Sequence, residues 1–143
     1  MIWFMIFLIV CSVSFVRPAH IPENDLGDIL RPASKIWHKQ CTLITGATEE
    51  QIEELKQGKF ADDENIQKYV SCLGLISGVI KTDITFDEKL VKHYLPDNLE
   101  YKLAQHIECL NAAKNIVLKD ATKQIWHAVQ CAYKKDPEKF LMF

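Results

Sequence analysis

Cysteines and histidines are the residues of this sequence whose types and spacing best suit site chemistry. His106 stands three residues before Cys109, and His127 stands four residues before Cys131. On a helix, either spacing places the imidazole and the sulfur on one face, so two helices together offer the ligands of a tetrahedral zinc site. A disulfide between these cysteines competes with zinc, and the cysteine count suits both arrangements. Because the sequence has no Cys-x-x-Cys pair and its N-terminus indicates export, we expect a disulfide and no metal.

Patterns that mark the common enzyme classes are missing from the sequence. It contains no H-E-x-x-H, G-x-S-x-G, phosphate-loop or dinucleotide-binding fingerprint. None of its five histidines has a neighbouring aspartate in the sequence, as a secreted helical phospholipase would have beside a calcium loop. The formal net charge is −2 and the basic residues form no stripe, so no nucleic-acid partner is expected. We expect a protein that is not an enzyme and that has no cofactor.

The N-terminus carries the pattern of a secretory signal peptide. Residues 2–11 form an uncharged apolar run that is too short to span a bilayer as a helix, and small residues follow it. We expect residues 1–19 to be the signal peptide, with cleavage between residues 14 and 20. Residues 20–143 would then form one helical domain, secreted and extracellular, and Cys11 would leave with the signal peptide.

Apolar residues of the mature sequence recur at three- and four-residue steps, which indicates amphipathic helices. No stretch alternates as a half-buried strand would. Capping residues and helix breakers predict about six helices, from Asn24 or Asp25 to Gly46, from Thr48 to Gly58, from Asp62 or Asp63 to Ile80, from Thr85 to Pro96, from Asp97 to Ala113, and from Asp120 to Tyr133. The expected fold class is all-α.

Two further features indicate close packing. Gly74 and Gly78 lie one turn apart inside the expected third helix, each at a cost of about 1 kcal/mol relative to alanine. Such a pair allows a ligand or another helix to approach the backbone. The last four residues, 140–143, are all apolar, and we expect them to pack against the body, where they complete the core or close a cavity.

The mature sequence contains four cysteines, Cys41, Cys72, Cys109 and Cys131, separated by 30, 36 and 21 residues. An even number in an exported chain predicts two disulfides, and spacing alone does not choose among the three possible pairings. Each bridge would close a loop of tens of residues and stabilise the fold by roughly 3–4 kcal/mol.

This spacing, in an exported helical chain of this length, resembles that of the insect odorant-binding proteins, the pheromone- and general-odorant-binding group. Residues 72–80 and 84–87 are similar to the family's third helix and its turn into the fourth. Residues 120–122 and 131–140 are similar to its last helix and C-terminal tail. The resemblance covers essentially the whole mature chain.

One departure from the family pattern is specific. The family usually has six cysteines, and the two further positions hold Lys68 and Thr122 here. Both partners of one bridge are absent together, as in the family's four-cysteine (minus-C) subgroup. The resemblance then implies the pairing Cys41–Cys72 and Cys109–Cys131.

The resemblance also implies a function, that of a carrier which holds odorants or pheromones in a closed apolar cavity and transports them through aqueous lymph. The implied partners are a small apolar volatile ligand, a membrane odorant receptor and a second copy in a homodimer. Apolar side chains of the inner helix faces and the tail are the expected ligand-binding residues: Leu73, Ile76, Val79, Phe86, Leu90, Tyr94, Ile107, Leu110, Trp126, Val129, Phe140, Met142 and Phe143. Tyr69, Tyr94 and Trp126 are the candidates for a polar contact. The alternative is a secreted interaction protein on the same scaffold outside olfaction, such as a venom, salivary or seminal component.

Overall fold

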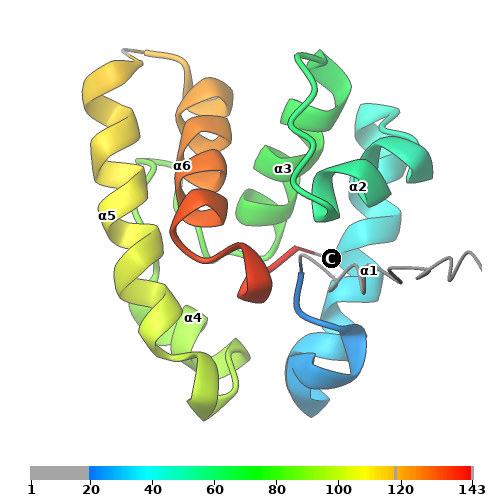
Figure 1. Ribbon diagram of the computed structural model, residues 1–143, viewed down its shortest axis with the longest axis vertical. Coiled ribbons are helices and arrows are strands. Elements are labelled where there is room, and N and C mark those ends of the chain that lie inside the picture. The colour runs from blue at the N-terminus through cyan, green and yellow to red at the C-terminus, as the bar shows by residue number, and fades with distance from the viewer. Residues whose placement is uncertain (1–19, 118, 143) are drawn as a thin grey trace, which may run out of the picture.

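The computed structural model describes residues 20–117 and 119–142 (Figure 1). In order along the chain, its α-helices and 3₁₀-helices (η) are η1 Glu23–Leu26, α1 Gly27–Thr45, α2 Glu49–Lys56, α3 Glu64–Ile76, α4 Glu88–Tyr94, η2 Asp97–Leu99, α5 Tyr101–Ile116, α6 Ala121–Lys135 and η3 Pro137–Lys139. Within these ranges, the one β-type pairing is an isolated antiparallel β-bridge between Ile80 and Phe86. The expected all-α class with six α-helices is confirmed. The predicted signal peptide and Phe143 lie outside the described residues.

Three helix contacts organise the fold. Helix α5 packs against α6, α6 against α3, and α3 against α1, so neighbouring helices run across the molecule from α5 to α1 (Figure 1). Helix α4 contacts both α1 and α5. The tail after α6 crosses toward α1, and the N–H of Ile21 donates to the carbonyl of Phe140 at 2.8 Å. In the part of the chain described, none of the helices has the length and apolarity needed to cross a bilayer.

Two disulfides tie the helix pairs together. Cys41–Cys72 joins α1 to α3, and Cys109–Cys131 joins α5 to α6. This is the pairing that the family resemblance implies. Because the sulfurs of Cys109 and Cys131 are bonded to each other, neither is a thiolate, and the zinc alternative for this position is wrong.

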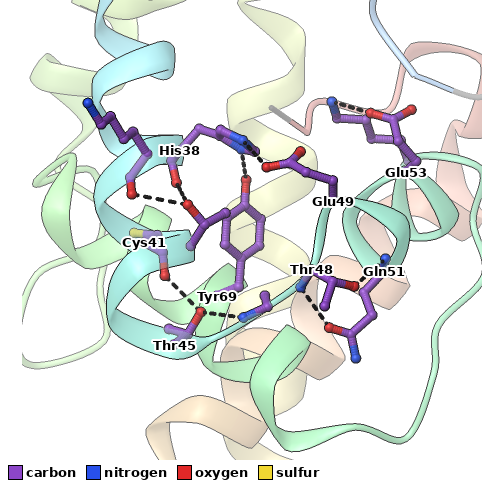
Figure 2. Close-up of polar contacts among 12 residues, drawn as sticks. His38, Cys41, Thr45, Thr48, Glu49, Gln51, Glu53 and Tyr69 are labelled. Atoms are coloured by element: carbon purple, nitrogen blue, oxygen red, sulfur yellow. Dashed lines mark hydrogen bonds and ion pairs between the residues drawn. The ribbon is translucent and has the colours of Figure 1, made fainter.

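Helix starts follow the local capping signals at three places. The hydroxyl of Thr48 accepts from Gln51 N at 3.2 Å, and the Gln51 side chain accepts from Thr48 N at 2.9 Å, which completes the capping box of α2 (Figure 2). Asp63 caps α3 and Asp120 caps α6 through side-chain oxygens. Gly46 ends α1 in the left-handed conformation, with φ 73°. Each of these caps involves backbone groups of the adjacent helical turn, and for this reason the local sequence predicts it.

The predicted start of the first helix is wrong. Asn24 and Asp25 lie inside the 3₁₀ turn η1, and neither caps α1, whose N-cap position is Leu26. The guanidinium of Arg31 instead donates to the carbonyl oxygens of Glu23 and Asn24, at 3.3 and 2.8 Å. A side chain one turn into α1 therefore holds the 3₁₀ turn that precedes the helix.

The third helix ends one turn earlier than its apolar stripe suggests. Gly78 has φ 74°, and the N–H of Ile80 donates back to the carbonyl of Gly74 at 2.9 Å. A methyl group added to Gly74 would lie 2.6 Å from Cδ1 of Ile80. The two glycines thus serve a reversal in which the chain packs closely on its own helix, and Ile80 is not helical.

The capping box predicted at Thr85 is also wrong. The Thr85 hydroxyl donates to Oδ1 of Asp83 at 2.6 Å, whereas Asp87 accepts from Leu90 N and caps α4. Two caps compete within three residues, and the loop preceding α4 selects the later one.

Candidate binding cavity

An apolar cavity of about 140 Å³ lies between the helices. An engineered protein cavity of about 150 Å³ holds benzene, so this space suits a molecule of about one ring or a short chain. Every α-helix except α2 contributes to its wall, together with the loop after α3 and the tail: Leu30, Trp37, Val70, Leu73, Gly74, Val79, Ile80, Phe86, Val91, Tyr94, Leu95, Leu103, His106, Leu110, Ile125, Ala128, Val129, Leu141 and Met142.

Helical periodicity brings a few side chains of each helix to the cavity. On α5, Leu103, His106 and Leu110 are three and four residues apart and share one face. On α6, Ile125 and Val129 are one turn apart on the face toward the cavity. The wall is therefore assembled from narrow stripes of separate helices, of which α1 is joined to α3 and α5 to α6 by the disulfides.

The loop between α3 and α4 supplies a non-helical part of the wall. Its ends are joined by the Ile80–Phe86 bridge and by Asp87 N–H donating to the Val79 carbonyl at 2.9 Å. Ile84 has φ 58°, an unfavourable conformation for a β-branched residue, and its side chain is buried. Burial of Ile84 compensates for the backbone strain and holds the loop against the body.

Three lining side chains carry polar atoms: Trp37, Tyr94 and His106. The rings of Trp37 and Tyr94 meet edge to face with centroids 5.0 Å apart. Nδ1 of His106 lies 2.7 Å from the carbonyl oxygen of Lys102, which can only accept, so Nδ1 carries the proton. Burial lowers the pKa of His106 below its ordinary value of 6.5, so the ring is neutral at pH 7.

The tail reaches the cavity with Leu141 and Met142, and two anchors hold it there. Phe140 is 2% exposed and packs edge to face on Tyr133, with centroids 5.2 Å apart. At the start of the tail, Asp136 accepts from the buried ammonium of Lys102 at 2.7 Å. This hydrogen bond lowers the pKa of the Asp136 carboxyl.

Many of the residues expected at the ligand lie along the cavity, and these are Leu73, Val79, Phe86, Tyr94, Leu110, Val129 and Met142. Five lie outside its lining: Ile76, Leu90, Ile107, Trp126 and Phe140. Phe143 is outside the described residues.

Two of the five are displaced by the early end of α3. Ile76 is the last residue of α3 and is 38% exposed, because the chain reverses at Gly78 before another turn can cover it. Leu90 packs toward that reversal, where its Cδ2 lies 3.1 Å from the position of a Cβ on Gly78. The prediction for Ile76 assumed a third helix that continued to Ile80, and the prediction for Leu90 assumed that the fourth helix turns this residue toward the cavity.

The other three expected residues pack in parts of the molecule outside the cavity. Trp126 and Phe140 are buried, but they pack around Phe60, with ring centroids 5.4 and 6.2 Å away. Ile107 is half-buried and follows His106 directly, so it is rotated off the α5 stripe that faces the cavity. Apolar character predicted burial for Trp126 and Phe140 without indicating which apolar region they enter.

Twelve lining residues are not among the expected ligand-binding residues, although Gly74 and the tail that holds Leu141 were expected near a ligand or cavity: Leu30, Trp37, Val70, Gly74, Ile80, Val91, Leu95, Leu103, His106, Ile125, Ala128 and Leu141. Most of them occupy the apolar helix stripes that the sequence predicts. The signal for burial was therefore present. No local pattern tells which stripe faces an empty space.

A second arrangement that the sequence interpretation missed is polar (Figure 2). Nε2 of His38 lies 2.9 Å from Oε1 of Glu49, and Nδ1 lies 2.8 Å from the hydroxyl of Tyr69. Since the carboxylate can only accept, Nε2–H donates to Glu49, while Nδ1 and the Tyr69 hydroxyl share the second hydrogen bond. This chain of contacts joins α1, α2 and α3 beside a polar depression on the other side of Met142. It places Tyr69 in that network, away from the cavity.

Comparisons with known proteins agree with this geometry. Residues 30–135 match the PBP/GOBP family. Odorant binding protein 5 of Apis mellifera is similar in structure, with a TM-score of 0.63 at 23% identity over 85% of this chain and 97% of that one. Odorant binding protein 4 of Chrysopa pallens has a TM-score of 0.63 at 24% identity over 78% of this chain and 94% of that one. Curated proteins yield no significant sequence match.

Proposed function

The chain belongs to the PBP/GOBP family, and from this premise we propose that it is a secreted, non-catalytic carrier of small apolar molecules. Odorants or pheromones occupy the cavity and are transported through aqueous lymph to a membrane receptor. The cavity itself carries this proposal. Ligand pockets are mostly apolar with a few polar groups, and three of the side chains in this wall have a polar atom.

The remaining parts of the proposal concern the chain's processing and its place in the family. Removal of residues 1–19 and secretion are supported by the apolar run at the N-terminus and by two disulfides, which persist in oxidising compartments. Membership of the four-cysteine subgroup is supported by Lys68 and Thr122, which stand where the third family bridge would be. Lys68 is exposed and pairs with Glu64 of its own helix at 2.7 Å.

Displacement of a fluorescent apolar probe by a panel of volatiles tests the carrier function. We expect micromolar displacement by one-ring and short-chain compounds. Ala128→Phe, on the cavity wall, should weaken every ligand at least tenfold because the added ring occupies the space. The matched control is Ala112→Phe on the exposed side of α5, which should bind as the native protein does.

The outcomes separate the two candidate functions. Probe binding that is lost in Ala128→Phe and kept in Ala112→Phe supports a carrier. A native protein that binds neither the probe nor any volatile would instead favour a secreted interaction protein on this scaffold.

A further inference from the structure

His106 differs from the other lining residues of the cavity in its hydrogen bonding. It stands between Leu103 and Leu110 on the inner stripe of α5, and the edge of its ring faces Phe86, with centroids 6.3 Å apart. Its Nδ1–H is fully used by the carbonyl of Lys102, one turn back along the same helix. The opposite nitrogen, Nε2, therefore points away from the helix that bears the ring.

The protonation of the ring follows from this contact. A backbone carbonyl cannot donate, so the proton stays on Nδ1, and Nε2 keeps its lone pair in the plane of the ring. Among the described residues, no side chain or backbone group donates to Nε2. Burial and the nearby charge of Lys102 both lower the pKa of His106, so the lone pair remains available at neutral pH.

We propose that Nε2 of His106 is the acceptor that selects ligands bearing a hydroxyl group, so that small apolar alcohols and phenols are the preferred class for this cavity. The proposal rests on the carrier function proposed above. A hydroxyl can donate to Nε2, whereas an aldehyde, ketone or ester oxygen would face the lone pair without a proton between them. In an apolar wall, such a mismatch leaves two acceptors desolvated and unpaired.

A ligand set of equal size tests this assignment by calorimetry. Benzyl alcohol, benzaldehyde and ethylbenzene share one ring and the same number of heavy atoms. A net hydrogen bond of typical strength should make the native protein prefer the alcohol over the aldehyde by about three- to tenfold. His106→Phe should lose this preference while binding ethylbenzene at least as tightly as before.

Two further variants make the test specific. His127→Phe makes the same substitution at an exposed position of α6, and it should keep the native preference. Tyr94→Phe removes the hydroxyl of another lining residue. A preference lost in Tyr94→Phe but kept in His106→Phe would assign the ligand hydroxyl to Tyr94 and overturn the proposal.

A measurement on the native protein requires no substitution. The ¹⁵N resonances of His106 should show a protonated Nδ1 and an unprotonated Nε2, and benzyl alcohol, but not benzaldehyde, should shift the Nε2 signal upfield. Equal affinity for alcohol and aldehyde with an unmoved Nε2 signal would overturn this inference and leave the carrier function standing. A native protein that binds none of these three compounds, nor the fluorescent probe or any volatile of the panel, would overturn both.

Discussion

Helix α6 borders two apolar regions that are filled very differently. Toward the cavity it presents short aliphatic side chains, including Ala128 and Val129, and the space in front of them stays open. On an adjoining face it presents the rings of Trp126 and Tyr133, which make edge-to-face contacts with Phe60, the residue that precedes α3 by four positions, and Tyr133 also contacts Phe140 of the tail. Phe60 and Phe140 contact each other as well. We call these four residues the aromatic cluster.

The difference separates a stabilising core from a binding space. The aromatic cluster buries large rings and fixes the tail, which are contributions to stability. A void of about 140 Å³ has the opposite effect, on the order of 3 kcal/mol of lost packing from the measured dependence of stability on cavity volume. A fold that could fill this space with larger side chains but leaves it open is built to receive a ligand.

Truncating one side chain in each of the two regions should give the largest difference in stability. We expect Phe140→Ala to lower the free energy of unfolding by about 3–5 kcal/mol, because it opens a cavity in a filled cluster and releases the tail. Val79→Ala, on the half-buried cavity wall, should cost only about 1 kcal/mol because its side chain already borders a void. Urea unfolding of the oxidised protein measures both. Equal losses would mean that the two regions are packed alike.

Adding the disulfide that the family has and this chain lacks should stabilise the helices on the cavity side. Lys68 lies on α3 and Thr122 on α6, two helices that pack together beside the cavity. We expect Lys68→Cys with Thr122→Cys to form a third disulfide and to raise stability by about 2–4 kcal/mol. Thermal unfolding and thiol titration provide the measurement, with each single cysteine variant as a control. Two free thiols and an unchanged melting temperature would show that the residues are wrongly aligned with the family.

Loss of the contact between Asp136 and Lys102, the polar anchor of the tail, should reduce stability less than Phe140→Ala does. Asp136→Asn removes the charge that faces the buried ammonium of Lys102, and we expect a loss of about 1–3 kcal/mol. The loss stays below that for a fully buried pair because Asp136 is partly exposed. Lys102→Met is the matched variant: combined with Asp136→Asn it should recover part of the loss, since no unpaired charge then remains. Additive losses in the double variant would argue against a direct pairing.

Acidification should have the smallest effect on stability, and this effect arises at His106 in the cavity wall. The pKa of His106 is lowered mainly by burial, so the unfolded chain binds a proton at a higher pH than the folded protein does. The contribution of His106 to stability is therefore complete above about pH 6.5 and declines as the pH falls through its lower folded-state pKa. His20, whose pKa is also lowered by burial, acts in the same direction. His106→Phe should flatten the dependence of urea midpoints on pH between 7 and 5, whereas an unchanged slope would contradict a lowered pKa for His106 in the folded protein.

The helix boundaries show how far local sequence carries. Thr48, Asp63 and Asp120 cap their helices as predicted, because a cap involves backbone groups within one turn. The predictions at Asn24 and Thr85 are wrong, because a neighbouring side chain or a competing cap supplies the contact there. The predicted third helix is too long because Ile80 continues its apolar spacing, although Gly78 has already reversed the chain.

The sequence by itself determined the helical class, the family resemblance and the positions of most buried side chains. Hydrophobic periodicity, capping chemistry and cysteine spacing are properties of the chain alone, and they suffice for these conclusions. Only the tertiary structure decided that Leu110 and Val129 face an open space while Trp126 and Phe140 complete a filled one. The physical reason is that burial depends on the apolar character of each residue, whereas a cavity depends on the summed volumes of side chains that several helices bring together.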